Sequence, residues 1–160
     1  MARNRQPKPP IEAQQVQAEC FLLCDFARAE NRKLYIIGGG WDQIVPQRLP
    51  LDYVAYLATK LVLPGELLTE PVILRIELLD QNGQVIGEPV YESILESSSA
   101  DLPIEIAERD LLRLVVFMGN EVKMTLREPG LFTLKLLVNA QAIADTKFTV
   151  TPAHSEFASP

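Results

Sequence analysis

The segment from Glu19 to Ile44, ECFLLCDFARAENRKLYIIGGGWDQI, limits the possible fold more than any other part of the chain. Apolar runs on both sides of the polar group Glu30–Lys33 have the composition of two strands joined by a turn. We therefore expect strands at Glu19–Phe26 and Lys33–Ile37 that pair with each other as an antiparallel hairpin.

Three consecutive glycines, Gly38–Gly40, follow the second of these strands and lead into the only tryptophan, Trp41. Glycine adopts positive φ angles that a Cβ disfavours, so alanine in this turn is expected to cost about 1 kcal/mol of stability. The indole of Trp41 either plugs the end of the fold, with its N–H bonded to a backbone carbonyl, or serves as an exposed binding anchor. In the second case Asp42 is its polar neighbour. The sequence favours the plug.

Length and composition predict one folded domain. The chain has 160 residues, and its 48% hydrophobic content is enough for a single core and too high for wholesale disorder. We expect the domain at residues 18–151, with a flexible Pro- and Gln-rich tail at residues 1–17 and a second tail at residues 152–160.

Charge and hydropathy exclude two classes of partner. The formal net charge of −6 argues against a phosphate-binding surface, which needs clustered Lys and Arg, so nucleic acid is not expected as a partner. The opening MARNRQPKPP is not followed by the apolar run of a secretory signal. No run approaches the ~18 apolar residues of a membrane-spanning helix. We therefore expect a cytoplasmic protein with no membrane partner.

Most of the remaining chain has strand character. Val72–Leu79 alternates apolar and polar residues, as does a strand with one face in water. Asn82-Gly83 is a strong hairpin signal, and Gln84–Ile86 is expected to return alongside. Further strands are expected at Tyr53–Leu63, Leu111–Met118, Val122–Leu126 and Phe132–Val138, with a closing strand through Phe148 and Val150.

Irregular segments separate these strands. Glu92–Asp101 is expected to be a surface loop, with a short helix as the alternative, and Gly119-Asn120 is expected to turn the chain. Ile106–Leu112 has a helical turn as an alternative to extended structure. About seven to nine strands at this spacing favour an all-β fold, an antiparallel immunoglobulin-like β-sandwich.

Three motifs, CDFARAENRKLYIIGGGWDQI, LRIELLDQNGQ and EPGLFTLKLLVNAQ, resemble those of a group of uncharacterised bacterial single-domain proteins. That family is marked by a CD-[FY]-A-[RK] strand, a GGGWD turn and a terminal pair of strands. The resemblance covers Ala18–Thr151 and supports the β-sandwich fold. It implies no activity and no catalytic residue. Where the family is expected to have a glycine in the first turn, this chain has Asn31-Arg32, so a different turn type is expected.

The two cysteines, Cys20 and Cys24, lie in the first predicted strand. Four residues of strand span about 13 Å, too far for a disulfide, whose Cα atoms lie within ~7 Å. The even spacing puts both thiols on one face with Leu22 and Phe26, so we expect them to be reduced and buried. A helix would bring them close enough for a metal pair. The sequence has no CxxC motif, however, and its one histidine, His154, lies in the C-terminal tail, so no metal or cofactor is expected.

No catalytic constellation can be recognised in the sequence. The glycine triplet lacks the spacing of a P-loop or of a dinucleotide-binding fingerprint, and no histidine base lies outside the tail. Asp25, Glu30 and Asp42 could form an acid/base or calcium pair, but they lack the D-x-D-x-D-G spacing, so solvated charges are the better account. Asp25 and Arg28 are expected to be cross-strand partners at the end of the hairpin. We therefore expect a protein that is not an enzyme.

Several predicted strands are apolar on both faces. In Lys33–Ile37, Tyr35 and Ile37 point away from Leu34 and Ile36, so whichever pair fills the core leaves the other pair without cover. Loops or a second subunit can provide that cover.

These patterns favour a non-catalytic protein-interaction or assembly module. It is expected to bind a protein partner or to form a homo-oligomer. A small-ligand-binding domain, or an enzyme with its site near the GGGWD turn, is the alternative. The candidate interaction residues are Tyr35, Ile37, Trp41 and Asp42.

Overall fold

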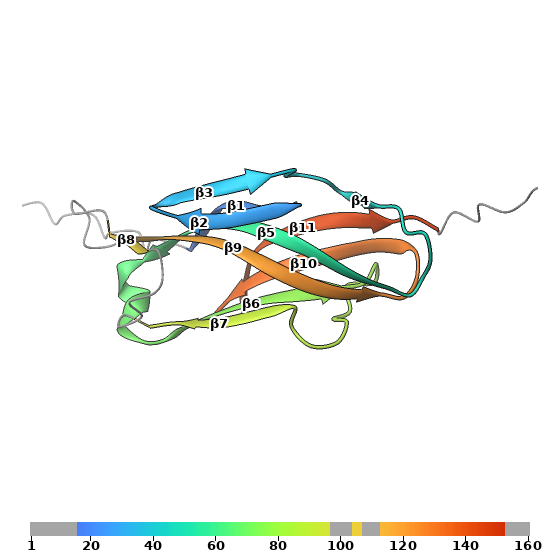
Figure 1. Ribbon diagram of the computed structural model, residues 1–160. Helices are drawn as coiled ribbons and strands as arrows, with labels where there is room; N and C mark the ends of the chain where they lie inside the picture. The colour runs from blue at the N-terminus through green and yellow to red at the C-terminus, as the bar shows by residue number, and fades with distance from the viewer. Residues whose placement is uncertain (1–15, 97–103, 107–112, 153–160) are drawn as a thin grey trace, which may run out of the picture.

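Strands make up almost all of the regular structure in residues 16–96, 104–106 and 113–152, which are the residues that the computed structural model describes (Figure 1). The helical element in these ranges is a short 3-10 turn, η1, at Gly65–Thr69. No helix in the described ranges has the length and apolar character needed to cross a membrane. The strands are β1 (Gln17–Cys24), β2 (Phe26–Glu30), β3 (Lys33–Ile37), β4 (Gln43–Ile44), β5 (Leu51–Pro64), β6 (Val72–Leu79), β7 (Tyr91–Leu95), β8 (Ile104–Ile106), β9 (Arg113–Leu126), β10 (Gly130–Val138) and β11 (Gln141–Val150).

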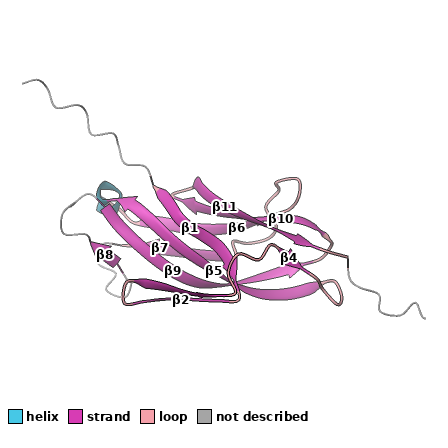
Figure 2. Ribbon diagram, turned by 90° about the horizontal axis from the view of Figure 1, so that it is seen from above, coloured by secondary structure: helices cyan, strands magenta, loops and turns pink. Residues whose placement is uncertain are grey.

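The strands form two larger sheets and a separate hairpin, as Figure 1 and Figure 2 show. One sheet has the order β1-β5-β9-β8, the other has the order β4-β11-β10-β6-β7, and β2 pairs with β3. Neighbouring strands run antiparallel except β4 and β11, which pair in parallel. The all-β, antiparallel architecture predicted from the sequence is confirmed.

The main core lies between the two larger sheets. Alternate residues of their strands fill it, because successive side chains of a strand point to opposite faces. Leu57 and Leu61 of β5 face Leu134 and Leu136 from the opposite sheet within this fully buried cluster. Burial of apolar surface at roughly 25 cal/mol per Å² is the main force that holds the two layers together.

The expected strand Glu19–Phe26 is two strands in the structure. β1 pairs with β5, whereas β2 pairs with β3. The break falls at Asp25, whose N–H donates to the carbonyl oxygens of Ile37 and Gly38 at 3.1 and 3.3 Å. The predicted hairpin is therefore right for β2 and wrong for β1, because long-range pairing with β5 draws the first half of the segment into another sheet.

The hairpin β2–β3 packs on the outer face of the sheet that contains β5 and β9 (Figure 1). Where the hairpin meets the sheet, Cys24, Ala27 and Ala58 form a second buried cluster, with Leu22 and Leu34 packed around them. Small side chains at the contact let the two backbones approach closely. The hairpin thus supplies part of the cover that strands apolar on both faces need.

β9 runs without interruption through Gly119-Asn120, so the turn predicted there is wrong. Glycine occupies position 119 for a different reason. A Cβ at position 119 would lie 2.5 Å from the carbonyl carbon and oxygen of Ala27 in β2. Only glycine allows the backbone of the hairpin to approach β9 this closely.

The tip of the hairpin is a two-residue turn at Asn31 and Arg32, whose φ angles are 51° and 59°. Two positive φ values define a type I′ turn, whose twist matches that of the flanking strands. Asn139 and Ala140 join β10 to β11 with φ angles of 48° and 64°, the same geometry. Both tight hairpins are therefore formed without glycine at the central positions.

β6, β10 and β11 confirm the strands predicted at Val72–Leu79 and across the last hairpin. The Asn82-Gly83 signal also marks a turn, in which the Gly83 N–H donates to the Asp80 carbonyl at 3.0 Å. The returning segment makes an isolated bridge between Leu79 and Val85 rather than a strand.

On the side of β6 away from β10, the paired strand is β7, at Tyr91–Leu95. A surface loop or short helix at Glu92–Asp101 was expected there, and that expectation is wrong for the first four of these residues, because they are extended and paired with β6. Residues 97–101 lie outside the described residues, as do most of the predicted tails at 1–17 and 152–160. Of the alternative helical turn at Ile106–Leu112, Ile106 ends strand β8 and the rest lies outside the described residues.

Cys20 and Cys24 are free thiols on the outer face of β1, beneath the hairpin. Cys24 is fully buried and its Sγ donates to the Tyr56 carbonyl at 3.4 Å, whereas Cys20 is half-buried. Burial raises the pKa of both thiols, which keeps them protonated at neutral pH and lowers their reactivity.

Labelling with a thiol reagent tests this arrangement. We expect Cys24 of the native protein to react at least about a hundredfold more slowly than in urea, because the hairpin must open first. Cys20 is expected to react at an intermediate rate. Peptide mass spectrometry at successive times separates the two residues, and rapid labelling of Cys24 would mean that the hairpin does not cover β1.

Candidate functional site

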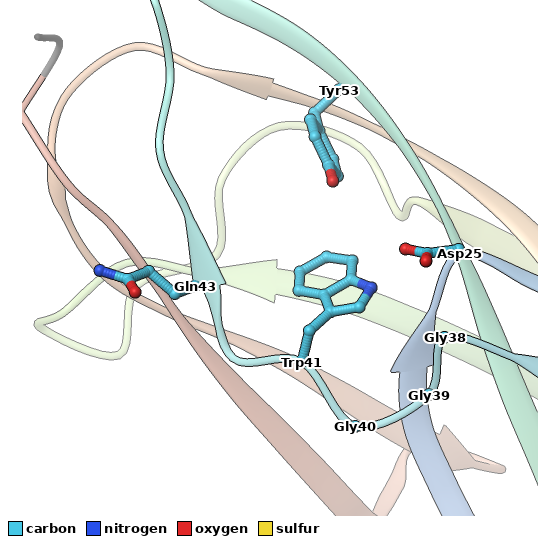
Figure 3. Close-up of a pocket in the computed structure, with 7 residues that line it drawn as sticks. All are labelled: Asp25, Gly38, Gly39, Gly40, Trp41, Gln43 and Tyr53. Atoms are coloured by element: carbon cyan, nitrogen blue, oxygen red, sulfur yellow. The ribbon is translucent and has the colours of Figure 1, made fainter.

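An open pocket of about 500 Å³ lies where the end of β1, the glycine turn and β5 meet (Figure 3). In Figure 3 the side chains of Asp25, Trp41 and Tyr53 converge on this space. The lining comes from three separate parts of the chain, so the pocket is a product of the fold. Its lining residues are Asp25, Gly38, Gly39, Gly40, Trp41, Gln43 and Tyr53.

The glycine turn forms one wall of the pocket. Gly38 and Gly40 have φ angles of +60° and +82°, a region that side chains with a Cβ rarely adopt. A Cβ on Gly38 would also lie 2.0 Å from Oδ2 of Asp25, so the carboxylate occupies the space that a side chain would need. The Gly40 N–H donates to the Leu23 carbonyl at 2.7 Å, which anchors the turn to the end of β1.

Trp41 is half-buried at the edge of the main core. Its ring meets Tyr53 and Phe148 edge-on, with centroid separations of 5.8 and 6.3 Å. This packing agrees with the plug interpretation. The predicted bond from the indole N–H to a backbone carbonyl is wrong, because Nε1 is buried with no acceptor among the described residues. In Figure 3 this nitrogen points toward Asp25.

The carboxylate of Asp25 is exposed and has no ion pair within the described ranges. Its expected partner, Arg28, forms an ion pair with Glu30 instead, at 3.3 Å. Burial raises the pKa of the Tyr53 phenol, and the negative charge of Asp25 raises it further. The phenol therefore remains a protonated donor at neutral pH. Chemically, the pocket offers a carboxylate, a phenol O–H and two aromatic rings.

A second candidate surface lies beside the pocket, on the outer side of the hairpin. Its register sets Phe26 opposite Ile37 and Arg28 opposite Tyr35, so these four side chains share one face. The three large apolar ones, Phe26, Tyr35 and Ile37, are 39%, 48% and 63% exposed, and we call them the hairpin patch.

The predicted interaction residues divide between the two surfaces. Tyr35 and Ile37 belong to the hairpin patch, and Trp41 lines the pocket. Asp42 is exposed but belongs to neither surface; its carbonyl accepts a hydrogen bond from the Thr149 N–H at 2.8 Å, which ties the chain before β4 to β11.

Three pocket residues, Asp25, Gln43 and Tyr53, were not predicted as site residues. Asp25 carried a signal, because a charge that follows the apolar run of a predicted strand often marks a break or a site. Tyr53 carried none, because it joins the pocket from a strand that the sequence gives no reason to place next to the glycine turn. No group of three or more His, Cys, Asp or Glu side chains within the described ranges could hold a metal ion.

Comparisons with known proteins give one family match. Residues 19–151 match a family described as a family of unknown function, DUF6941. No curated protein matches the chain. Among solved structures, the chain is similar to the Pseudomonas fluorescens alkylpurine DNA glycosylase AlkC bound to DNA containing an abasic site analog, with 11% identity and a TM-score of 0.40. The match covers 86% of this chain and 30% of that one, and a TM-score this low supports no conclusion about function.

Proposed function

The chain belongs to the family of unknown function DUF6941, and from that premise we propose that it is a non-catalytic assembly module that self-associates through the hairpin β2–β3. One observation carries the proposal. The hairpin patch exposes three large apolar side chains beside a strand, β3, whose outer edge has no partner strand among the described residues. An apolar face next to a free strand edge is the geometry that strand-to-strand association uses.

Alternate residues of β3 direct their backbone N–H and C=O groups to its outer edge, as pairing with another strand requires. Because a two-residue turn closes the hairpin, Lys33 and Tyr35 are the positions that bond to β2. The N–H and C=O groups of Leu34 and Ile36 therefore point to the outer edge. A second antiparallel β3 could bond to them and extend the hairpin into a four-stranded sheet.

The distribution of charge supports a second copy of the chain as the occupant. Lys33 lies at one end of β3, and Asp25 lies at the other end, where its N–H bonds to the carbonyl of Ile37. Antiparallel pairing about a two-fold axis brings the basic end of each strand to the acidic end of its partner. The surface is therefore complementary to itself.

The fold proposed for the module is an immunoglobulin-like β-sandwich. The sheet order β1-β5-β9-β8 corresponds to the order of the first sheet in that fold, and β11-β10-β6 corresponds to its second sheet. On this assignment the hairpin β2–β3 is an insertion after the first strand. The strands of this insertion do not pair with the strands of the sandwich. The outer edge of β3 therefore stays available for binding.

Replacing Tyr35 with glutamate tests the assembly function. We expect wild-type protein to sediment as a dimer and the Tyr35→Glu variant to dissociate, with a dissociation constant raised at least about a hundredfold. Tyr35 lies at the centre of the paired strands, so each dimer would place two carboxylates side by side. Sedimentation velocity at several protein concentrations measures the change.

Leu131→Glu is the matched control. Leu131 is 44% exposed, close to the 48% of Tyr35, but it lies on β10 in the other sheet. This variant should keep the wild-type mass. A monomeric wild-type protein, or equal dissociation in both variants, would contradict the proposed surface, and thermal melting verifies that each variant is folded.

A ligand site near the glycine turn is the second candidate function. The pocket supports it, because an unpaired carboxylate and two aromatic rings meet there. The expected cytoplasmic location and the expected lack of nucleic-acid and membrane partners stay predictions.

A further inference from the structure

The pocket beside the hairpin patch has a definite electrostatic preference. Asp25 is the only charged residue among the described residues that line it, and the rings of Trp41 and Tyr53 form part of its wall. The carboxylate attracts a cation through its charge, and the neighbouring aromatic rings offer apolar surface to the carbon stem that carries the cation. An anion would be repelled by the carboxylate of Asp25, which sits against the glycine turn.

We propose that this pocket binds the ammonium group of Lys33 from a second copy of the chain. The inference rests on the proposed self-association and adds the contact that fixes its register. A basic side chain would then enter each pocket, so each dimer would contain the contact twice.

The register follows from the two-fold axis. If the two β3 strands pair antiparallel with Tyr35 opposite its own copy, Lys33 of one chain lies opposite Ile37 of the other. Ile37 is followed by Gly38, and Oδ2 of Asp25 lies 2.0 Å from the position that a Cβ on Gly38 would occupy. A lysine at that position would place its flexible four-carbon stem beside the glycine turn on which the carboxylate rests.

The size and openness of the pocket suit this occupant. Its volume of about 500 Å³ is ample for an ammonium group and part of its stem. The phenol of Tyr53 and the edge of Trp41 can contact that stem while the charge lies near Asp25.

The chemistry of the pocket can be tested without assembly. The Tyr35→Glu variant, expected to be monomeric, is titrated with n-butylammonium chloride while the fluorescence of Trp41, the only tryptophan, is recorded. We expect a saturable change with n-butylammonium and none with 1-butanol or sodium chloride. Adding Asp25→Asn to the variant should weaken the response at least about tenfold, because the carboxylate supplies the only charge in the site.

The source of the ammonium group is tested in the otherwise wild-type chain. Lys33→Gln should raise the dimer dissociation constant about tenfold, because a partly exposed ion pair is lost at two places in each dimer. Lys33→Arg keeps the charge and should restore most of the association. Lys147→Gln, which removes an exposed lysine on β11, is the control and should have no effect.

The outcomes separate the two proposals. Dimers that assemble equally well with Lys33→Gln overturn the assignment of Lys33 to the pocket and leave self-association standing. A titration with no saturable response to n-butylammonium overturns the chemistry of the pocket. A monomeric wild-type protein overturns the self-association on which both depend. Circular dichroism of each variant verifies that the fold is retained.

Discussion

Replacing Gly119 with alanine is expected to lower the free energy of unfolding by about 2 kcal/mol or more, because the new methyl group overpacks the contact with the hairpin. Its Cβ would lie 2.5 Å from the carbonyl carbon and oxygen of Ala27 and 2.7 Å from the backbone nitrogen of Arg28. These are main-chain atoms of a paired strand, so no side-chain rotation can relieve the overlap. The hairpin β2–β3 as a whole must move away from β9.

Urea denaturation of Gly119→Ala measures this loss, and Gly83→Ala is the comparator. Gly83 has a φ of +77° and open space around it, so alanine there is expected to cost about 1 kcal/mol through backbone strain alone. Faster labelling of Cys24 in Gly119→Ala would show that the hairpin has lifted, because this thiol lies beneath it. Wild-type stability and wild-type labelling in this variant would mean that the hairpin is not held against β9.

The elements that could be predicted from the sequence are those whose signals are local. Val72–Leu79 and the last hairpin have clear alternation, and their turns carry residues that favour tight turns. The pairing of β2 with β3 also follows from a short range of sequence. In each case the residues that determine the structure are neighbours along the chain.

The errors occur where a distant partner decides the structure. The break at Asp25 exists because β1 pairs with β5, more than 30 positions away along the register Cys24↔Tyr56. Gly119 has the local signature of a turn, yet its cause is a contact with Ala27 in another strand. Local propensity cannot distinguish a glycine that turns the chain from one that admits a neighbouring backbone.

In the candidate site, too, the residues with a local sequence signal could be predicted, and those placed by distant parts of the chain could not. The glycine turn and Trp41 are adjacent in sequence, so their importance could be predicted. Tyr53 reaches the pocket from β5, and the carboxylate of Asp25 lies there only because the chain leaves its sheet at that residue. Tyr35 and Ile37 are exposed, as the expected alternation along β3 allows, but on the opposite face the protein's own sheet covers Leu34 and leaves Ile36 38% exposed.

The second large effect is expected at Gly38, where alanine should destabilise the fold by about 2 kcal/mol, against about 1 kcal/mol for alanine at Gly40. Both glycines have positive φ angles, +60° and +82°, so the backbone strain that alanine introduces should cost a similar free energy at the two positions. Nothing lies within 4 Å of a Cβ on Gly40, whereas a Cβ on Gly38 would overlap the carboxylate of Asp25. The difference between the two variants therefore measures the cost of displacing that carboxylate.

A double-mutant cycle isolates this contribution. Asp25→Ala removes the carboxylate, so the extra cost of Gly38→Ala over Gly40→Ala should largely disappear in the Asp25→Ala background. Urea denaturation provides all the free energies. The response of Trp41 fluorescence to n-butylammonium in the Tyr35→Glu chain should also be lost with Gly38→Ala and kept with Gly40→Ala, because only the first substitution moves Asp25. Equal costs at the two glycines in both backgrounds would mean that Asp25 does not rest against the turn, and the proposed ammonium site would then lose the residue that defines its charge.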